Sequence, residues 1–97
     1  MYFSIPVVVR GYKESGIPFE EITDTVDICS DGGLIQLQTP VRDEQLLLLK
    51  NGKTGEETVC YVVSNGNSTD GRAHVGVRFF GPSLRFWGLE FLREPCE

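Results

Sequence analysis

The sequence predicts an all-β domain, a small antiparallel barrel or sandwich of six short strands. Apolar and polar residues alternate with a period of two along most of the chain. Turn residues (Gly, Asn, Asp, Pro) recur at regular spacing between these stretches, and no long amphipathic helical pattern occurs. A chain of 97 residues is long enough for one modest core, so we expect a single domain over residues 1–97.

The first three strands are expected over residues 4–12, 19–28 and 34–39. The first contains the β-branched run VVV and is bounded by Gly11. The second alternates as FEEITDTVDI, with Asp24 interrupting its apolar side. The third, LIQLQT, alternates again. Each therefore has the pattern of a half-buried strand.

The last three strands are expected over residues 46–50, 58–64 and 73–80. LLLLK is a short, continuous apolar run followed by NGKTG, which favours a strand that ends in a hairpin. TVCYVVS is rich in β-branched and aromatic residues, and AHVGVRFF alternates cleanly. The side chains expected to point into the barrel are Val7, Val9, Ile22, Val26, Ile28, Ile35, Leu37, Leu47, Leu49, Val59, Tyr61, Val63, Val75, Val77 and Phe79.

A short aromatic C-terminal tail, SLRFWGLEF, follows Gly81 and Pro82. Phe86, Trp87 and Phe91 are too large and too close together to be left in water, so we expect them to plug one open end of the barrel. The alternative is an exposed patch that binds a partner protein. On that reading Phe86 and Trp87 are candidate interaction residues.

The bulk composition argues against several classes of partner. A net charge of −5 and a pI near 4.8 are opposite to those of most DNA- and RNA-binding proteins. No run approaches the roughly 18 apolar residues that span a bilayer, so no membrane insertion is expected. The start, MYFSIPVVVRG, lacks the basic segment and cleavage site of a secretion signal. We therefore expect a cytoplasmic protein whose three cysteines are free thiols.

Catalytic signatures are weak. The only histidine, His74, is expected on a strand, and there is no G-x-S-x-G, P-loop or suggestively spaced Cys–His pair. We expect a protein that is not an enzyme and that requires no cofactor.

The corner TVDICSDGG, residues 25–33, carries the most suggestive spacing. Asp27, Cys29, Asp31 and Gly32 occupy four places of a calcium-loop pattern, but a thiol stands where an oxygen ligand is required and Gln38 stands where a bidentate glutamate is required. A strand also follows in place of a helix, so no metal site is expected. Turn chemistry alone would account for the corner.

The corner also resembles a known family. Asp27-x-Cys29-x-x-Gly32, placed between two strands, is similar to the Asp/Asn-x-Ser-x-x-Gly motif of PilZ domains. Stretches over essentially the whole chain agree with that resemblance: VVVRG, TVDICSDGGLIQL, VGVRFFGPS and FWGLEF. The resemblance implies a split six-stranded barrel in a bacterial signalling module, whose ligand in many members is cyclic di-GMP. It places Asp27, Cys29 and Gly32 in the ligand site, with Cys29 replacing a serine.

The resemblance also implies an Arg-x-x-x-Arg segment just before the first strand, which wraps over the ligand. Its place falls at or before Met1, and MYFS contains no arginine. Arg10 is the nearest arginine and the remaining candidate ligand residue, although it lies inside the first strand. Two hypotheses follow. The first is a PilZ-like regulatory module with impaired or absent cyclic di-GMP binding that acts through a protein partner. The second is a functional cyclic di-GMP receptor.

Overall fold

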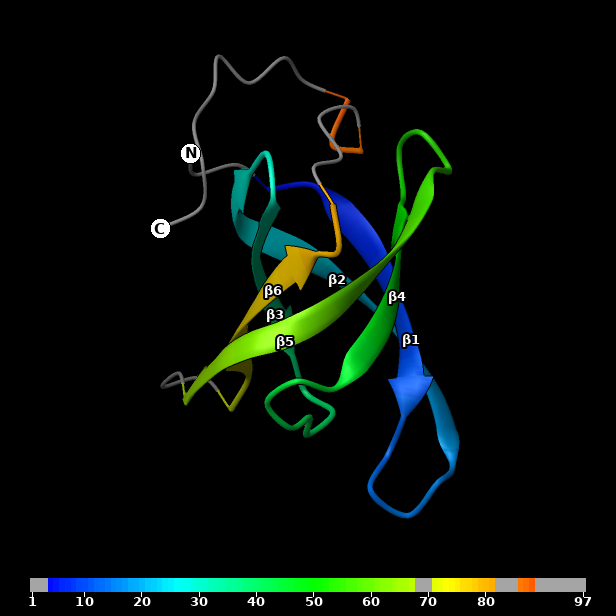
Figure 1. Ribbon diagram of the computed structural model, residues 1–97, viewed down its shortest axis with the longest axis vertical. Helices are drawn as coiled ribbons and strands as arrows, with labels where there is room; N and C mark the ends of the chain where they lie inside the picture. The colour runs from blue at the N-terminus through cyan, green and yellow to red at the C-terminus, as the bar shows by residue number, and fades with distance from the viewer. Residues whose placement is uncertain (1–3, 68–70, 82–85, 89–97) are drawn as a thin grey trace.

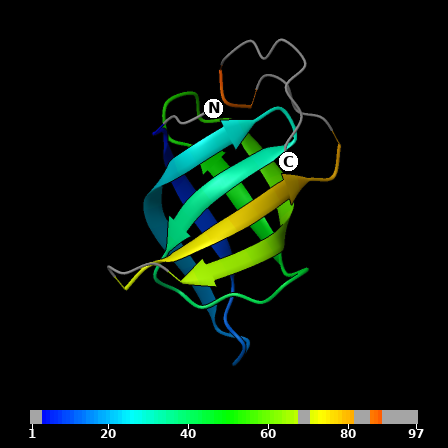
Figure 2. The ribbon, with the colours of Figure 1, turned by 90° about the vertical axis from the view of Figure 1, so that its left-hand side faces the viewer.

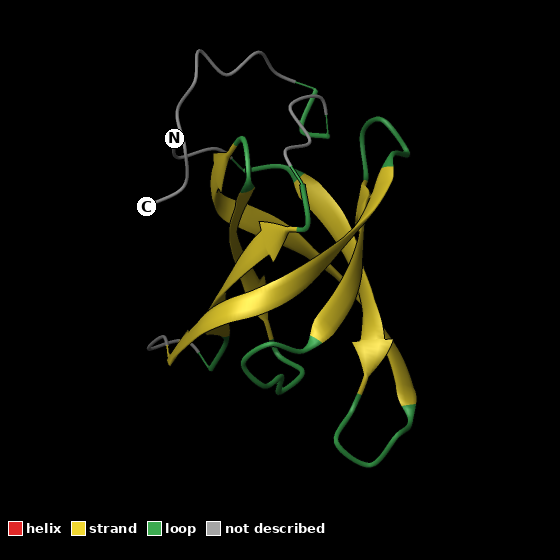
Figure 3. Cartoon of the chain, viewed as in Figure 1, coloured by secondary structure: helices red, strands yellow, loops and turns green. Residues whose placement is uncertain are grey.

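The structure, a computed structural model, describes residues 4–67, 71–81 and 86–88. It confirms an all-β architecture, with no helix among the described residues. The strands are β1 (Pro6–Tyr12), β2 (Pro18–Cys29), β3 (Gly32–Leu37), β4 (Leu46–Asn51), β5 (Glu57–Asn67) and β6 (Ala73–Phe79). Each lies within a few residues of its expected position (Figure 3).

The six strands form a closed antiparallel barrel in the order β1-β2-β3-β6-β5-β4. Because β1 pairs with both β2 and β4, the ring of hydrogen-bonded strands has no gap. Figure 2 shows the side formed by β2, β3, β6 and β5, with the strands strongly tilted as closure of a small barrel requires.

The two ends of the barrel carry different connections. The β2–β3 corner, the β4–β5 turn and residues 86–88 gather at the upper end in Figure 1. The β1–β2 and β3–β4 connections lie at the lower end. Side chains from these segments must cover the two openings, since a barrel of this size encloses an apolar core.

The core confirms most of the expected inward positions. Those that are buried as expected are Val7, Val9, Ile28, Ile35, Leu37, Leu47, Leu49, Val75, Val77 and Phe79. Ile5 and Val41 join them from outside the strands. Cys60 is also in the core, where burial raises the pKa of its thiol to about 12 and keeps it neutral.

In the first half of β2, the expected assignment of side chains to the inside and outside of the barrel is wrong. Ile22 is 75% exposed, Val26 is only half-buried, and Thr23 and Thr25 point into the barrel instead. A register shift between Thr25 and Asp27 in the pairing with β3 is the reason. Such a bulge inserts one residue and reverses which side chains face inward, so Ile28 is buried although Ile22 is not.

The expected phase of β5 is also wrong. Cys60 and Val62 are buried, whereas Val59 and Val63 are each 46% exposed and Tyr61 is half-buried. Both faces of TVCYVVS are apolar, so alternation did not decide between them. The pairing fixes the choice, since Cys60 lies opposite the inward-pointing Phe79.

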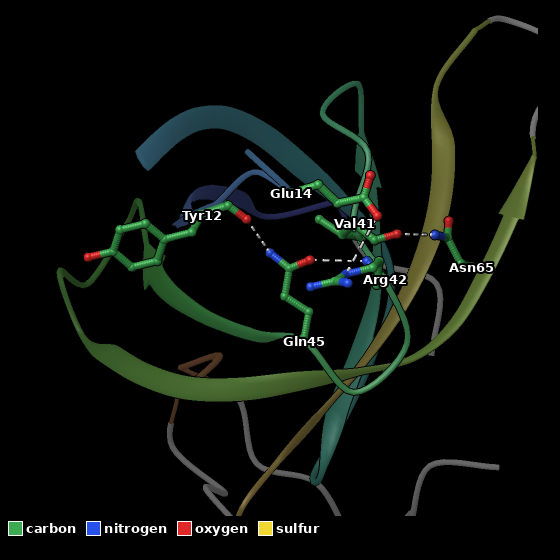
Figure 4. A network of polar contacts seen from close by, with 6 residues as sticks. All are labelled: Tyr12, Glu14, Val41, Arg42, Gln45 and Asn65. Atoms are coloured by element: carbon green, nitrogen blue, oxygen red, sulfur yellow. Dashed lines mark hydrogen bonds and ion pairs between the residues drawn. The ribbon is translucent and has the colours of Figure 1, made fainter. Parts of the chain in front are cut away.

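The lower end is closed by the β3–β4 connection. Val41 packs into the core, and its carbonyl accepts a 2.7 Å hydrogen bond from the Asn65 side chain (Figure 4). Gln45 donates to the Tyr12 carbonyl at 2.7 Å and accepts from the Arg42 N–H at 3.0 Å. These side chains tie the connection to β1 and β5, which holds Val41 in place.

The two inward threonines of β2 differ in hydrogen bonding, and this difference can be measured. The Thr25 hydroxyl accepts a 2.8 Å bond from the Ile5 N–H, whereas Thr23 Oγ1 has no partner among the described residues. We expect Thr23→Val to raise the free energy of unfolding by about 1 kcal/mol, because it removes an unsatisfied buried hydroxyl. Thr25→Val, the matched control, should lower it by about 1–2 kcal/mol. Chemical denaturation checks both, and a loss of stability in Thr23→Val would contradict this account.

Candidate functional site

The corner that the sequence singled out is the tight turn between β2 and β3. Strand β2 ends at Cys29, Ser30 and Asp31 make the turn, and β3 begins at Gly32. The Asp31 carbonyl accepts a 2.6 Å hydrogen bond from the Phe79 N–H, so the turn is tied to the end of β6. The Ser30 hydroxyl donates to the Asp31 carboxylate at 3.1 Å.

Both glycines of the corner allow close approaches that a side chain would prevent. A Cβ atom on Gly32 would collide with the Val77 carbonyl oxygen and would lie 2.9 Å from the Arg78 Cα. A Cβ atom on Gly33 would lie 2.8 Å from the Asp27 carbonyl oxygen and 3.3 Å from the Trp87 ring. The glycines are therefore needed for packing, whether or not a ligand binds.

The corner is the docking site for Trp87. The indole N–H lies 3.0 Å from the Cys29 carbonyl oxygen and 3.1 Å from the Gly32 carbonyl oxygen. One donor thus joins both sides of the turn. The ring is 3% exposed, which means that the bond forms away from competing water.

Phe86 is held beside Trp87 by the β4–β5 turn. The buried Asn51 side chain donates to the Phe86 carbonyl at 2.8 Å, and its oxygen accepts from the Lys53 N–H at 2.8 Å. The ring centroids of Phe86 and Trp87 are 4.8 Å apart, and the Phe79 ring lies 5.3 Å from that of Phe86. Phe86 meets both other rings edge to face, and the cluster of three rings covers the upper opening.

For the described residues of the tail, this geometry decides between a plug of the barrel opening and an exposed patch that binds a partner. Phe86 is 1% exposed and Trp87 3%, so they plug the barrel and present no surface to a partner. The candidate interaction role of these two residues is therefore not supported. Phe91 lies outside the described residues.

The structure brings together three of the four candidate ligand residues. Asp27, Cys29 and Gly32 lie at the corner, with Cys29 directly opposite Gly32 and Asp27 opposite Leu34. Cys29 is disulfide-bonded, so the expectation of a free thiol is wrong there. Cys60 is free.

Arg10 does not join this group. Its guanidinium donates to the Glu20 carboxylate at 2.7 Å and lies 3.9 Å from that of Glu57. Asp27 lies seven residues further along β2 than Glu20, or about 20 Å at the usual rise of a strand. Arg10 therefore supplies no charge to the corner.

A second feature was missed by the sequence analysis. The outer surface of β4, β5 and the end of β6 carries large apolar side chains, which we call the β4–β5 face: Leu46, Leu48, Val59, Tyr61 and Phe80. Leu46 is 57% exposed and Phe80 67%. The signal was the doubly apolar pattern of TVCYVVS, which leaves one apolar set outside whichever set is buried.

Comparisons with known proteins give no assignment. The sequence matches no family model, no curated protein and no solved structure. Within the described ranges, no group of three or more His, Cys, Asp or Glu residues is placed to hold a metal ion. The same ranges contain no helix long and apolar enough to cross a membrane.

The tightness of the corner can be tested with two glycines. We expect Gly32→Ala to lower the free energy of unfolding by about 3 kcal/mol, because the new methyl group meets the backbone of β6. Gly81→Ala is the matched control, since a Cβ atom there has nothing within 4 Å. It should change stability by less than about 0.5 kcal/mol. Equal effects in thermal denaturation would show that the corner is not tightly packed.

Proposed function

We propose that this chain is a PilZ-like regulatory module that acts by binding another protein, and that its cyclic di-GMP site is impaired or absent. The observation that carries the proposal is the β4–β5 face. Its apolar side chains lie on the outside of a barrel whose core is already complete.

The contiguity of the face supports a protein partner. Leu46 lies directly opposite Tyr61, and Leu48 directly opposite Val59, so their side chains are cross-strand neighbours. The Tyr61 and Phe80 ring centroids are 5.1 Å apart, which extends the row to the end of β6. Single exposed apolar residues need no explanation, but a contiguous aromatic and aliphatic patch is typical of an interaction surface.

The state of the corner supports a weakened dinucleotide site. Two backbone carbonyls that border it already accept the Trp87 indole N–H, and the sulfur of Cys29 is engaged in a disulfide. The aspartate and the glycine of the motif are present. Arg10, however, is ion-paired far from them, so no arginine fork from β1 reaches the corner to bind a guanine or a phosphate.

Calorimetric titration with cyclic di-GMP tests the proposal. We expect no saturable heat up to high micromolar ligand, because Arg10 is ion-paired with Glu20 and does not supply the charged hydrogen bonds, each worth about 1.5–3 kcal/mol, that would hold the ligand. Asp27→Ala is the matched variant and should behave identically. Saturable binding that is lost in Asp27→Ala would establish the receptor function and overturn the proposal.

A further inference from the structure

The charges that border the β4–β5 face suggest which kind of partner it fits. Three cations lie on the described strands: Arg10 on β1, Lys50 on β4 and Arg78 on β6. Arg10 is ion-paired with Glu20. Lys50 and Arg78 make no ion pair within the described ranges, and both border the face.

Arg78 occupies one end of the face. It is exposed, it lies directly opposite Tyr61, and it precedes Phe80 by two residues on the same side of β6. Lys50 occupies the other end, two residues after Leu48 on the outer side of β4. Glu57 lies directly opposite Lys50 on β5, and its carboxylate is 3.9 Å from the Arg10 guanidinium. An apolar strip thus runs from Arg78 at one end to Lys50, with Glu57 beside it, at the other.

We infer that the β4–β5 face is the docking surface for an acidic amphipathic segment of another protein, one that presents large apolar side chains beside carboxylates. This inference rests on the proposed function and names the chemistry of its partner. The apolar row of the segment would cover Leu48, Tyr61 and their neighbours. Its carboxylates would reach the Arg78 guanidinium and the Lys50 ammonium. Pairing of rim charges adds specificity and association rate to the apolar contact.

A second copy of this chain fits the face less well. Two copies packed through the same face would each bring Lys50 and Arg78 to the interface. Like charges brought together in this way oppose association. A basic segment is disfavoured because its cations would meet the Arg78 guanidinium and the Lys50 ammonium.

Three synthetic amphipathic peptides provide the test. All share one row of leucine and phenylalanine, and their polar positions are glutamate, glutamine or lysine. Each is titrated into the isotopically labelled chain, and amide chemical shifts report affinity and location. We expect the glutamate peptide to bind most tightly, to shift Leu46, Tyr61 and Phe80, and to weaken as salt is added.

Matched variants separate charge from apolar contact. Arg78→Glu should weaken the glutamate peptide by about five- to tenfold and should favour the lysine peptide. Arg72→Glu makes the same charge change beside Gln36, away from the face, and should have no effect. Phe80→Ser should abolish binding of every peptide, whereas Ile22→Ser, at an equally exposed apolar site on β2, should not.

Each adverse outcome has its own meaning. If the glutamine peptide binds as tightly as the glutamate peptide, the inference about charge is overturned while the protein-binding proposal stands. If none binds at the face up to millimolar concentration, both are overturned. If sedimentation shows a dimer that Phe80→Ser dissociates, the occupant is a second copy and the inference fails.

Discussion

The hydrogen bonds from the Trp87 indole to the Cys29 and Gly32 carbonyls constrain the rest of the upper end. They need a turn tight enough to bring both carbonyls to one donor, and Gly32 and Gly33 provide that closeness. They also place the ring against Phe79 and Phe86, which completes the cover over the barrel opening. A buried indole N–H without an acceptor would cost about 1–3 kcal/mol, so the plug and the corner depend on each other.

This dependence gives the most suggestive motif in the chain a structural role that requires no ligand. The corner binds Trp87, which helps to cover the upper opening of the barrel. Val41 covers the opening at the opposite end. With both openings covered from within, the β4–β5 face is a contiguous apolar surface on the outside of the described part of the barrel. The interaction proposal follows from that surface. The cations Lys50 and Arg78 favour a partner that carries carboxylates.

The sequence predicted the fold well because β-branched runs and Gly/Asn turns marked every strand. It predicted inward residues reliably in β6, where His74, Gly76 and Arg78 alternate with the apolar Val75, Val77 and Phe79. It failed at Ile22, because a bulge after Thr25 changes the phase without changing the pattern. It failed in β5, because both faces are apolar.

For the site, local spacing identified Asp27, Cys29 and Gly32. The role of Trp87 there is a contact across more than 50 residues, which no local pattern contains.

The central claim is that Trp87 occupies the corner from within, and our proposal of impaired or absent cyclic di-GMP binding rests in part on it. Trp87 is the single tryptophan of the chain, so its indole N–H gives one unambiguous resonance. We predict that this proton exchanges slowly with solvent, at a rate limited by opening of the barrel, and that its chemical shift is unchanged by cyclic di-GMP. Fast exchange, or a saturable shift on adding the dinucleotide, would contradict the account.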